Sequence, residues 1–196
     1  MSRLFPERRE LRLEPDGLAA FRDEVCAWRG RVDLTVVLSN HFARYLVLQP
    51  QESATPEEEL ALARFQFARI HGERAKAWEV RLSRAGGGAR LACAIDAALL
   101  QDLKACMPKH GRVRLVSVQP YLMAAYNRAR SRIPREGAWL LLTEKGRACL
   151  ARLAAKGWAS VSYGAEGDGE QLIERERSRA SGERLPALVL KEQFAA

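Results

Sequence analysis

The 196-residue sequence lacks long hydrophobic runs, and none approaches the roughly 18 consecutive apolar residues that a membrane-spanning helix needs. Its first residues, MSRLFPERRELRLEPDG, carry charges where a signal peptide would have an apolar core. We therefore expect a protein that does not insert into a membrane and that is located in the cytoplasm.

Closely spaced cysteines are also missing. The four cysteines, Cys26, Cys93, Cys106 and Cys149, are scattered and form no CxxC pair of the kind that binds zinc. Each lies among apolar residues, which favours buried, reduced, structural thiols over a redox or catalytic thiol. We expect no metal site.

The motifs of nucleophilic catalysis are absent as well. The three histidines, His41, His71 and His110, fall at a predicted turn, a helix end and a loop, so their spacing indicates neither a catalytic triad nor a metal site. Ser39 has no G-x-S-x-G context. The sequence therefore predicts no catalytic residues and no enzyme activity.

A metal-dependent nuclease would need several carboxylates that converge on two metal ions. The predicted strands offer Asp33, Glu79 and Glu144, and none of them lies in the middle of an apolar strand with a matching partner. Asp96 is better explained as a helix cap. This absence argues against a nuclease.

Acidic residues are scarce in one part of the chain. Residues 104–156 contain twelve basic residues and two acidic ones, Glu136 and Glu144, whereas the whole chain has a net charge of +8. A basic face can bind nucleic acid, anionic lipid or an acidic protein, and it can equally be a solubilising surface. Both interpretations stay open.

Hydrophobic periodicity predicts an α/β protein. A helix over residues 56–71 is the best defined, because Thr55 can cap it, Pro56 suits its first position and acids follow in the first turn. The other predicted helices are residues 18–29, 97–107, 121–132 and 170–179. The predicted strands are residues 32–38, 45–49, 78–82, 90–95, 113–118, 138–143, 147–153, 158–163 and 185–190.

Residues 32–50, VDLTVVLSNHFARYLVLQP, form the most prominent apolar segment. Two runs rich in β-branched and aromatic residues flank the polar residues Ser39, Asn40 and His41, a pattern typical of a buried hairpin. The turn of such a hairpin can face a ligand. His41 with Arg44 can hold an anion there, or the turn is solvated and Arg44 pairs with an acid.

Three parts follow from the order of these elements. Residues 1–17 are expected to be a charged, irregular arm, residues 18–133 a first α/β lobe with two hairpins and helices, and residues 134–196 a second lobe. The second lobe has a three-strand meander, a helix and a strand, an order typical of ribonuclease H-like and actin-like folds. The expected fold therefore has mixed sheets in two unequal lobes.

Three segments resemble the cytoplasmic actin-like components of type IV pilus and type II secretion machines, the PilM and GspL type. They are VLSNH at residues 37–41, RLVSVQP at residues 114–120 and the hairpin at residues 138–150. The resemblance implies that the turn at Ser39, Asn40 and His41 and the turn at Thr143, Glu144 and Gly146 correspond to the two phosphate-binding turns of the fold.

Both turns depart from what phosphate binding requires, which is glycine-rich backbone and an acid for a metal. The first turn has neither, and the second has one acid, Glu144, and one glycine, Gly146. By comparison with this family, we also expect the chain to end before a complete second lobe. The resemblance therefore implies a shortened, degenerate member that binds no nucleotide cofactor and acts as a non-catalytic scaffold.

The partner implied by the resemblance is the cytoplasmic tail of an inner-membrane assembly protein, and a homodimer is a further expectation. The candidate partner-binding residues are Asn127, Arg128, Arg132 and Arg135, whose helical spacing puts the last three on one face. The edge strand at residues 185–190 is a second candidate surface. The alternative function is a basic nucleic-acid-binding module on a ribonuclease H-like fold.

Overall fold

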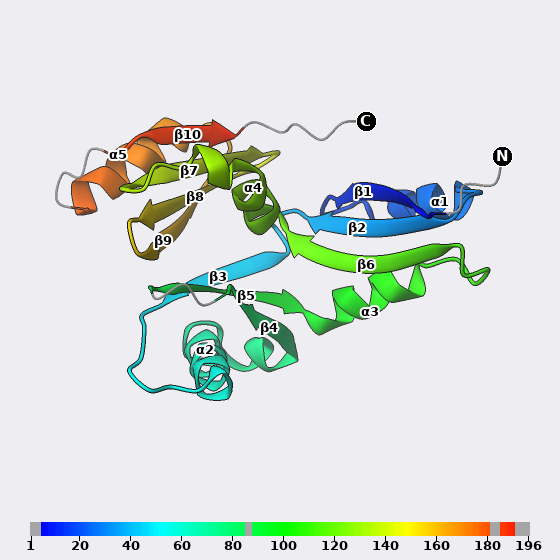
Figure 1. The fold of residues 1–196 in the computed structure, drawn as a ribbon, viewed down its shortest axis with the longest axis horizontal. Helices are drawn as coiled ribbons and strands as arrows, with labels where there is room; N and C mark the ends of the chain where they lie inside the picture. Colours follow the sequence, from blue (N-terminus) through cyan, green and yellow to red (C-terminus); the bar gives the residue numbers. More distant parts are fainter. Residues whose placement is uncertain (1–4, 85–87, 181–184, 191–196) are drawn as a thin grey trace.

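The computed structural model describes residues 5–84, 88–180 and 185–190, and within these ranges the chain forms three β-sheets with helices packed against them (Figure 1). The fold is therefore the mixed α/β type expected from the sequence.

The first sheet is entirely parallel, in the order β1-β2-β6. Helix α1 (Leu18–Ala27) connects its first two strands, as a parallel connection requires. Strand β2 is buried over most of its length because it has a partner on each side, which suits its nearly continuous apolar sequence. The strands are β1 (Glu7–Leu13), β2 (Val32–Leu38) and β6 (Val113–Pro120).

The second sheet is antiparallel, in the order β3-β5-β4. Helix α2 (Pro56–His71) covers it through Ala63 and Phe67, and its start is fixed by a capping box between Thr55 and Glu58. A 3-10 helix, η1 (Gly72–Ala77), returns the chain to β4, and α3 (Ala97–Ala105) leads from β5 towards β6. The strands are β3 (Ala43–Leu48), β4 (Trp78–Leu82) and β5 (Arg90–Asp96).

The third sheet has the order β10-β7-β8-β9. Its first three strands in the chain form an antiparallel meander, and β10 adds to β7 in parallel. Helix α4 (Tyr121–Ala129) and the 3-10 helix η2 (Arg130–Arg132) lead into it from β6. Its elements are β7 (Gly137–Glu144), β8 (Arg147–Ala154), β9 (Gly157–Gly164), α5 (Gly169–Arg179) and β10 (Ala187–Leu190).

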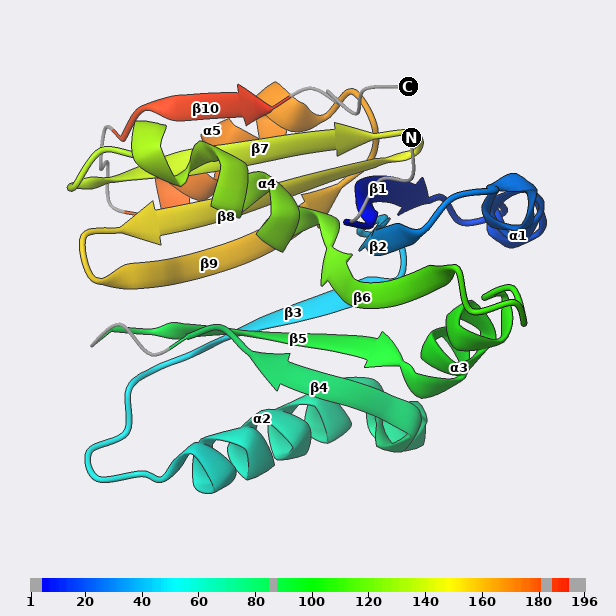
Figure 2. The same ribbon diagram turned by 45° about the vertical axis from the view of Figure 1, so that its right-hand side comes forward.

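Successive side chains of β7 point to opposite faces of the sheet and belong to two different hydrophobic clusters. Trp139 and Leu141 pack with α5, whereas Leu140 and Leu142 belong to the main core, which also contains residues of α4. Figure 2 shows α5 behind this sheet and α4 in front of it. The main core also includes residues of β1, β2, β3 and β5, so it holds the three sheets together.

The expected hairpin at residues 32–49 is wrong. Strand β2 pairs in parallel with β1 and β6, whereas β3 pairs with β5 in another sheet. Both runs are strands, as their composition indicates, but local composition does not select their partners. Ser39, Asn40 and His41 therefore lie in a connection between two sheets.

The expectation of an irregular N-terminal arm is also wrong in part, because Glu7–Leu13 forms edge strand β1. Its charged side chains are tolerated because one edge of the strand has no sheet partner among the described residues. The meander of residues 137–164, the β4–β5 pair and the edge position of β10 follow the expectations. The division into lobes at residues 17 and 133 stays a prediction.

Candidate functional site

The two polar turns singled out from the sequence lie against each other. The first connects β2 to β3 through Ser39 and Asn40, both of which are fully buried. The second joins β7 to β8 and begins at Glu144, which follows Thr143 and is buried as well. Although the turns are far apart in the sequence, hydrogen bonds run directly between them.

Glu144 makes the central contact. Its two carboxylate oxygens each lie 3.1 Å from the backbone nitrogen of Asn40, which donates to them. One of them also accepts from Arg12 Nη2 at 2.7 Å, and the guanidinium of Arg12 lies over the ring of Tyr121. The Glu144 side chain has no exposed surface and that of Arg12 is 9% exposed. The buried carboxylate is therefore paired and hydrogen-bonded, as burial of a charge requires.

Two more contacts hold the turns together. Arg147 Nη1 donates to the carbonyl oxygen of Asn40 at 2.9 Å. His41 Nε2 lies 3.0 Å from the carbonyl oxygen of Lys145 and donates to it when this nitrogen carries the proton. Gly146, in the second turn, donates its backbone N–H to Glu166. Polar groups of both turns are thus used within the protein.

The side chain of Asn40 ties the first turn to neighbouring elements. Its Oδ1 accepts from the hydroxyl of Tyr45 at 2.9 Å and from the backbone N–H of Leu122 at 3.3 Å. Burial raises the pKa of the Tyr45 hydroxyl, so this group stays protonated and can donate. Asn40 therefore connects β3 and the first turn of α4 at one point.

A shallow hollow of about 440 Å³ lies beside the junction and is lined by His41, Arg44, Gly146, Arg147, Tyr163 and Gly164. Arg44 Nη1 donates to the backbone carbonyls of His41 and Ala43, and among the described residues Arg44 forms no ion pair with an acid. The guanidinium of Arg147 lies over the ring of Tyr163. An anion site at His41 and Arg44 stays a prediction.

The junction differs from a phosphate-binding turn in the use of its backbone N–H groups. A phosphate-binding turn offers free backbone N–H groups to the anion. Here the N–H of Asn40 already binds a carboxylate of the chain itself, and a second anion would be repelled by Glu144. No group of three or more histidine, cysteine or acidic side chains placed to hold a metal ion occurs in the parts of the chain that the structure describes.

The candidate partner-binding residues lie apart from this junction. Asn127 and Arg128 are exposed on α4, and Arg128 forms an ion pair with Glu10 of β1. Because α4 ends at Ala129, the α-helical spacing expected for Arg128, Arg132 and Arg135 does not continue to the last two, although both are exposed. Their role in partner binding stays a prediction.

Sequence reasoning missed three residues of the junction, Arg12, Tyr45 and Arg147. Arg12 lies between Leu11 and Leu13, and such an apolar setting can signal a half-buried cation that needs an acid. Nothing local indicates which acid that is. Three cysteines are buried as expected, but Cys26 is exposed on α1.

No protein-family model matches the sequence, and no curated protein matches it. The structure is similar to the cytoplasmic domain of EpsL, an inner-membrane component of the type II secretion system of Vibrio cholerae, with a TM-score of 0.58 and 14% identity over 92% of this chain. It is also similar to the PilM–PilN type IV pilus biogenesis complex, with a TM-score of 0.54 and 13% identity over 84% of this chain.

A third similar structure is a Bacteroides thetaiotaomicron protein of unknown function with an actin-like ATPase fold, with a TM-score of 0.52 and 10% identity over 84% of this chain. The chain spans 68%, 52% and 61% of the lengths of the EpsL, PilM–PilN and Bacteroides chains, respectively. The resemblance inferred from the sequence is confirmed in structure: this chain has an actin-like fold.

Proposed function

We propose that this chain is a non-catalytic scaffold, located in the cytoplasm at the inner face of the inner membrane, that binds the cytoplasmic tail of an inner-membrane assembly protein. The observation that carries the proposal is the bond between Asn40 and Glu144, because it fills the junction of the two turns with a carboxylate of the protein itself.

The energetics of the junction support the absence of nucleotide hydrolysis. A bound phosphate would have to displace Glu144 from the N–H of Asn40 and from Arg12, and it would leave that carboxylate buried without its partners. Breaking a buried ion pair costs about 3–5 kcal/mol, a large part of the stability of an ordinary domain. Nucleotide binding at this place is therefore disfavoured.

The fold neighbours support a role in assembly. EpsL is an inner-membrane component of a secretion system, and PilM is found in complex with PilN. No helix in the described parts of this chain is long and apolar enough to cross a membrane. Attachment to the membrane through a partner's tail is consistent with the names of these two neighbours.

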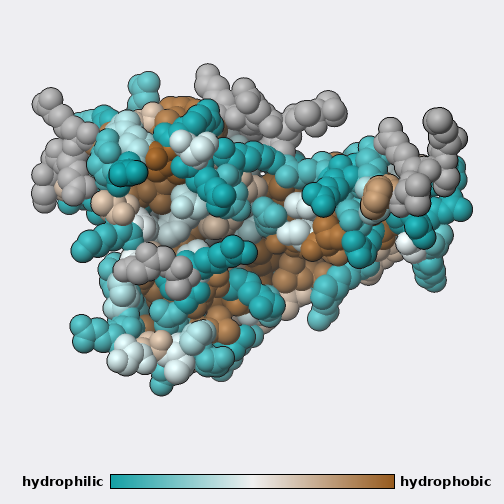
Figure 3. Space-filling view, in the orientation of Figure 1, coloured by the Kyte–Doolittle hydropathy of each residue, from teal (hydrophilic) through white to brown (hydrophobic). Residues whose placement is uncertain are grey.

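A groove between the first and second sheets can accommodate such a tail. It has a volume of about 440 Å³ and is lined by apolar Ile95, Leu100 and Val118. Glu79, Arg81 and Lys104 are also on its walls, and Arg81 pairs with Glu79. Figure 3 shows hydrophobic side chains gathered in the angle between β6 and β5. An apolar floor with the cation of Lys104 beside it fits an extended peptide that has both apolar and acidic side chains.

The partner role is tested with labelled synthetic peptides that correspond to the cytoplasmic tails of inner-membrane proteins encoded beside this gene. Fluorescence anisotropy is expected to detect one tail that binds, and Val118→Glu is expected to weaken it at least about tenfold. Val116→Glu is the matched control, because Val116 lies on the same strand, is 47% exposed and does not line the groove. Failure of every tail to bind would contradict the proposed partner.

The non-catalytic part is tested separately by calorimetric titration with magnesium-ATP. We expect no binding tighter than about 1 mM, which corresponds to about −4 kcal/mol. Micromolar binding of magnesium-ATP, or its hydrolysis by the purified chain, would contradict the non-catalytic role. This outcome does not depend on whether a tail peptide binds.

The structure does not favour the alternative of a nucleic-acid-binding module. Within the basic segment of residues 104–156, Arg114 is paired with Asp33, Arg128 with Glu10, and Arg147 donates to a backbone carbonyl. Cations that are already engaged contribute less to counterion release from nucleic acid. Salt-dependent binding of DNA or RNA would nevertheless support this alternative.

A further inference from the structure

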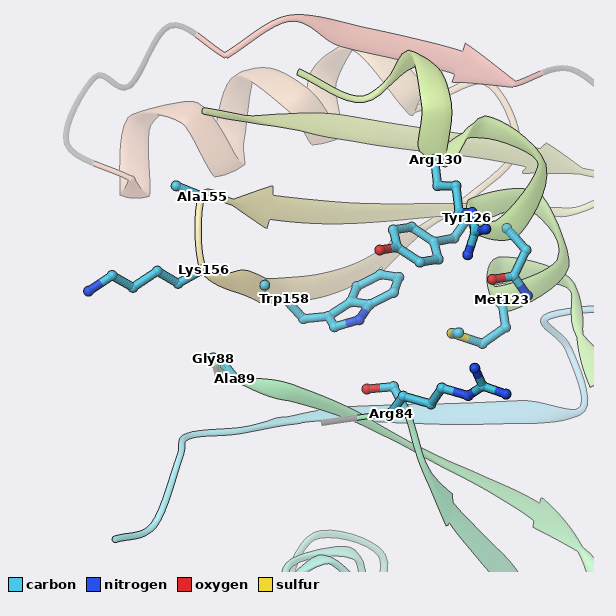
Figure 4. Close-up of a pocket in the computed structure, with 12 residues that line it drawn as sticks. Arg84, Gly88, Ala89, Met123, Tyr126, Arg130, Ala155, Lys156 and Trp158 are labelled. Atoms are coloured by element: carbon cyan, nitrogen blue, oxygen red, sulfur yellow. The ribbon is translucent and has the colours of Figure 1, made fainter. Parts of the chain in front are cut away.

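A second hollow is larger than the groove. It lies between α4, the β8–β9 turn, the residues that follow β4 and those that precede β5. It has a volume of about 660 Å³, and its lining contains no acidic residue. Figure 4 shows it in close-up. The lining residues are Ser83, Arg84, Gly88, Ala89, Met123, Tyr126, Asn127, Arg130, Ala155, Lys156, Gly157 and Trp158.

Two arginines place positive charge in this hollow, which we call the basic pocket. The side chains of Arg84 and Arg130 extend into it from different walls, whereas that of Lys156 extends away (Figure 4). Neither arginine side chain has a hydrogen bond or an ion pair with any of the described residues. By contrast, Arg90 is paired with Glu59 and Arg128 with Glu10. The two guanidinium groups are therefore available to a carboxylate, which they match in geometry.

An apolar surface adjoins these charges. The rings of Tyr126 and Trp158 have centroids 4.9 Å apart and are tilted by 49°, and Met123 lies beside them (Figure 4). The nitrogen of the Trp158 indole faces the side of the pocket where Arg84 lies. A ligand with both an acidic and an apolar side chain would find a partner for each.

The pocket is held open by a close backbone contact at its rim. A Cβ atom on Gly88 would overlap the carbonyl oxygen of Lys156, and one on Gly157 would lie 2.7 Å from the carbonyl oxygen of Ala89. The N–H of Trp158 also donates to Ala89, at 3.4 Å. Because two glycines allow this approach, the second and third sheets are joined at the rim and the pocket is formed before a ligand arrives.

We propose that the basic pocket binds an acidic segment of a partner protein. Carboxylates of the segment pair with Arg84 and Arg130, and an aliphatic or aromatic side chain packs against Met123, Tyr126 and Trp158. This goes beyond the proposed function, because the pocket is separate from the groove at Val118 and gives the scaffold a place for a second protein.

Two observations favour a protein segment over nucleic acid. Trp158 is only 6% exposed and its ring is tilted by 49° against Tyr126, so the pair forms no flat platform on which successive bases could stack, although a single side chain can pack against its exposed part. The hollow is also bounded, and Arg128, the basic residue of α4, is paired with Glu10. A long phosphate backbone needs a continuous basic groove instead.

Nuclear magnetic resonance of the isotopically labelled full chain tests the proposal. The indole N–H signals of its four tryptophans can be resolved, and Trp158→Phe identifies the one in the pocket. The probes are a short peptide of alternating Glu-Leu and Asp-Phe pairs, the same peptide with lysine in place of each acid, a single-stranded oligothymidylate and vesicles of phosphatidylglycerol.

We expect the acidic peptide to shift the Trp158 indole signal and the lysine peptide to leave it unchanged. The double variant Arg84→Glu/Arg130→Glu is expected to weaken the acidic peptide at least about tenfold, since each arginine offers a charge-assisted hydrogen bond. The control, Arg29→Glu/Arg64→Glu, alters exposed arginines outside the pocket by the same charge and is expected to change affinity less than about twofold.

The inference is overturned if the acidic peptide does not shift the Trp158 signal. It is also overturned if the control variant weakens peptide binding as much as the pocket variant does. A stronger shift of that signal by the oligothymidylate or by the vesicles than by the acidic peptide would overturn it as well. These outcomes leave the proposed scaffold role intact, since that role depends on tail binding at the groove and on the absence of magnesium-ATP binding.

Discussion

Both carboxylate oxygens of Glu144 lie 3.1 Å from the backbone nitrogen of Asn40, a residue 104 positions earlier in the chain. This contact joins the β7–β8 turn of the third sheet to the connection between the first and second sheets. With Arg12 on one carboxylate oxygen and Arg147 on the carbonyl of Asn40, all three sheets meet at one buried polar cluster. The cluster occupies the place where the sequence suggested a ligand site.

Removal of this carboxylate is expected to destabilise the whole chain. Glu144→Ala removes the acceptor of the Asn40 N–H and one of the acidic partners of Arg12, which keeps Glu14, and should lower the free energy of unfolding by about 3–5 kcal/mol. Glu144→Gln retains one acceptor and should lower it by about 1–3 kcal/mol. Urea denaturation followed by circular dichroism measures both. Glu136→Ala, at an exposed position, serves as the control, and a Glu144→Ala chain as stable as this control would contradict the role of the junction.

The capping box of α2 is expected to make stability depend on pH. The backbone N–H of Thr55, and secondly its hydroxyl, donate to Glu58 and lower the pKa of that carboxyl. Because the pKa is lower in the folded state, the unfolded state binds more protons as the solution is acidified, and this contribution to stability is lost as the pH falls through the folded pKa. The midpoint of thermal unfolding of the natural chain should exceed that of Glu58→Gln at about pH 7, and the difference should shrink as the pH falls below about 4.3, the ordinary pKa of a glutamate. Glu57→Gln leaves the capping box intact and should show a smaller change; an equal one would argue against the box.

The rim contact at Gly157 is expected to tolerate no side chain. Gly157 has φ +126° and a Cβ atom there would lie 2.7 Å from the carbonyl oxygen of Ala89, so Gly157→Ala should lower the free energy of unfolding by at least about 3 kcal/mol. Gly111 has φ +67° with open space around it, and Gly111→Ala should cost only about 1 kcal/mol. Chemical denaturation compares the two variants. Equal costs would mean that the close approach of the two sheets is dispensable.

The thiols are expected to differ sharply in reactivity. Cys26 is exposed, whereas burial raises the pKa of Cys93 and Cys149 and holds both as neutral thiols. Ellman's reagent should therefore modify one thiol rapidly in the folded chain and all four in urea. Cys26→Ser should abolish the rapid phase, and its persistence in this variant would contradict the burial of the others.

Much of the local structure could be predicted from the sequence because its causes lie within a few residues. Thr55, Pro56 and Glu58 specify the start of α2, and the structure begins the helix at Pro56. The meander of the third sheet was predictable for the same reason, since Lys145–Gly146 and Ala155–Lys156 are short turns between apolar runs. The strand character of β2 and β3 followed from their composition, but their pairing did not.

The α/β class, most helix and strand positions, and the lack of glycine and acid in the turn at Ser39, Asn40 and His41 can all be predicted from the sequence. The position of β2 between β1 and β6, the place of β3 in another sheet and the bond between Glu144 and Asn40 are visible only in the folded chain. Secondary structure depends on neighbours within a few positions, whereas these contacts join residues that only the packing of the shared hydrophobic core brings together.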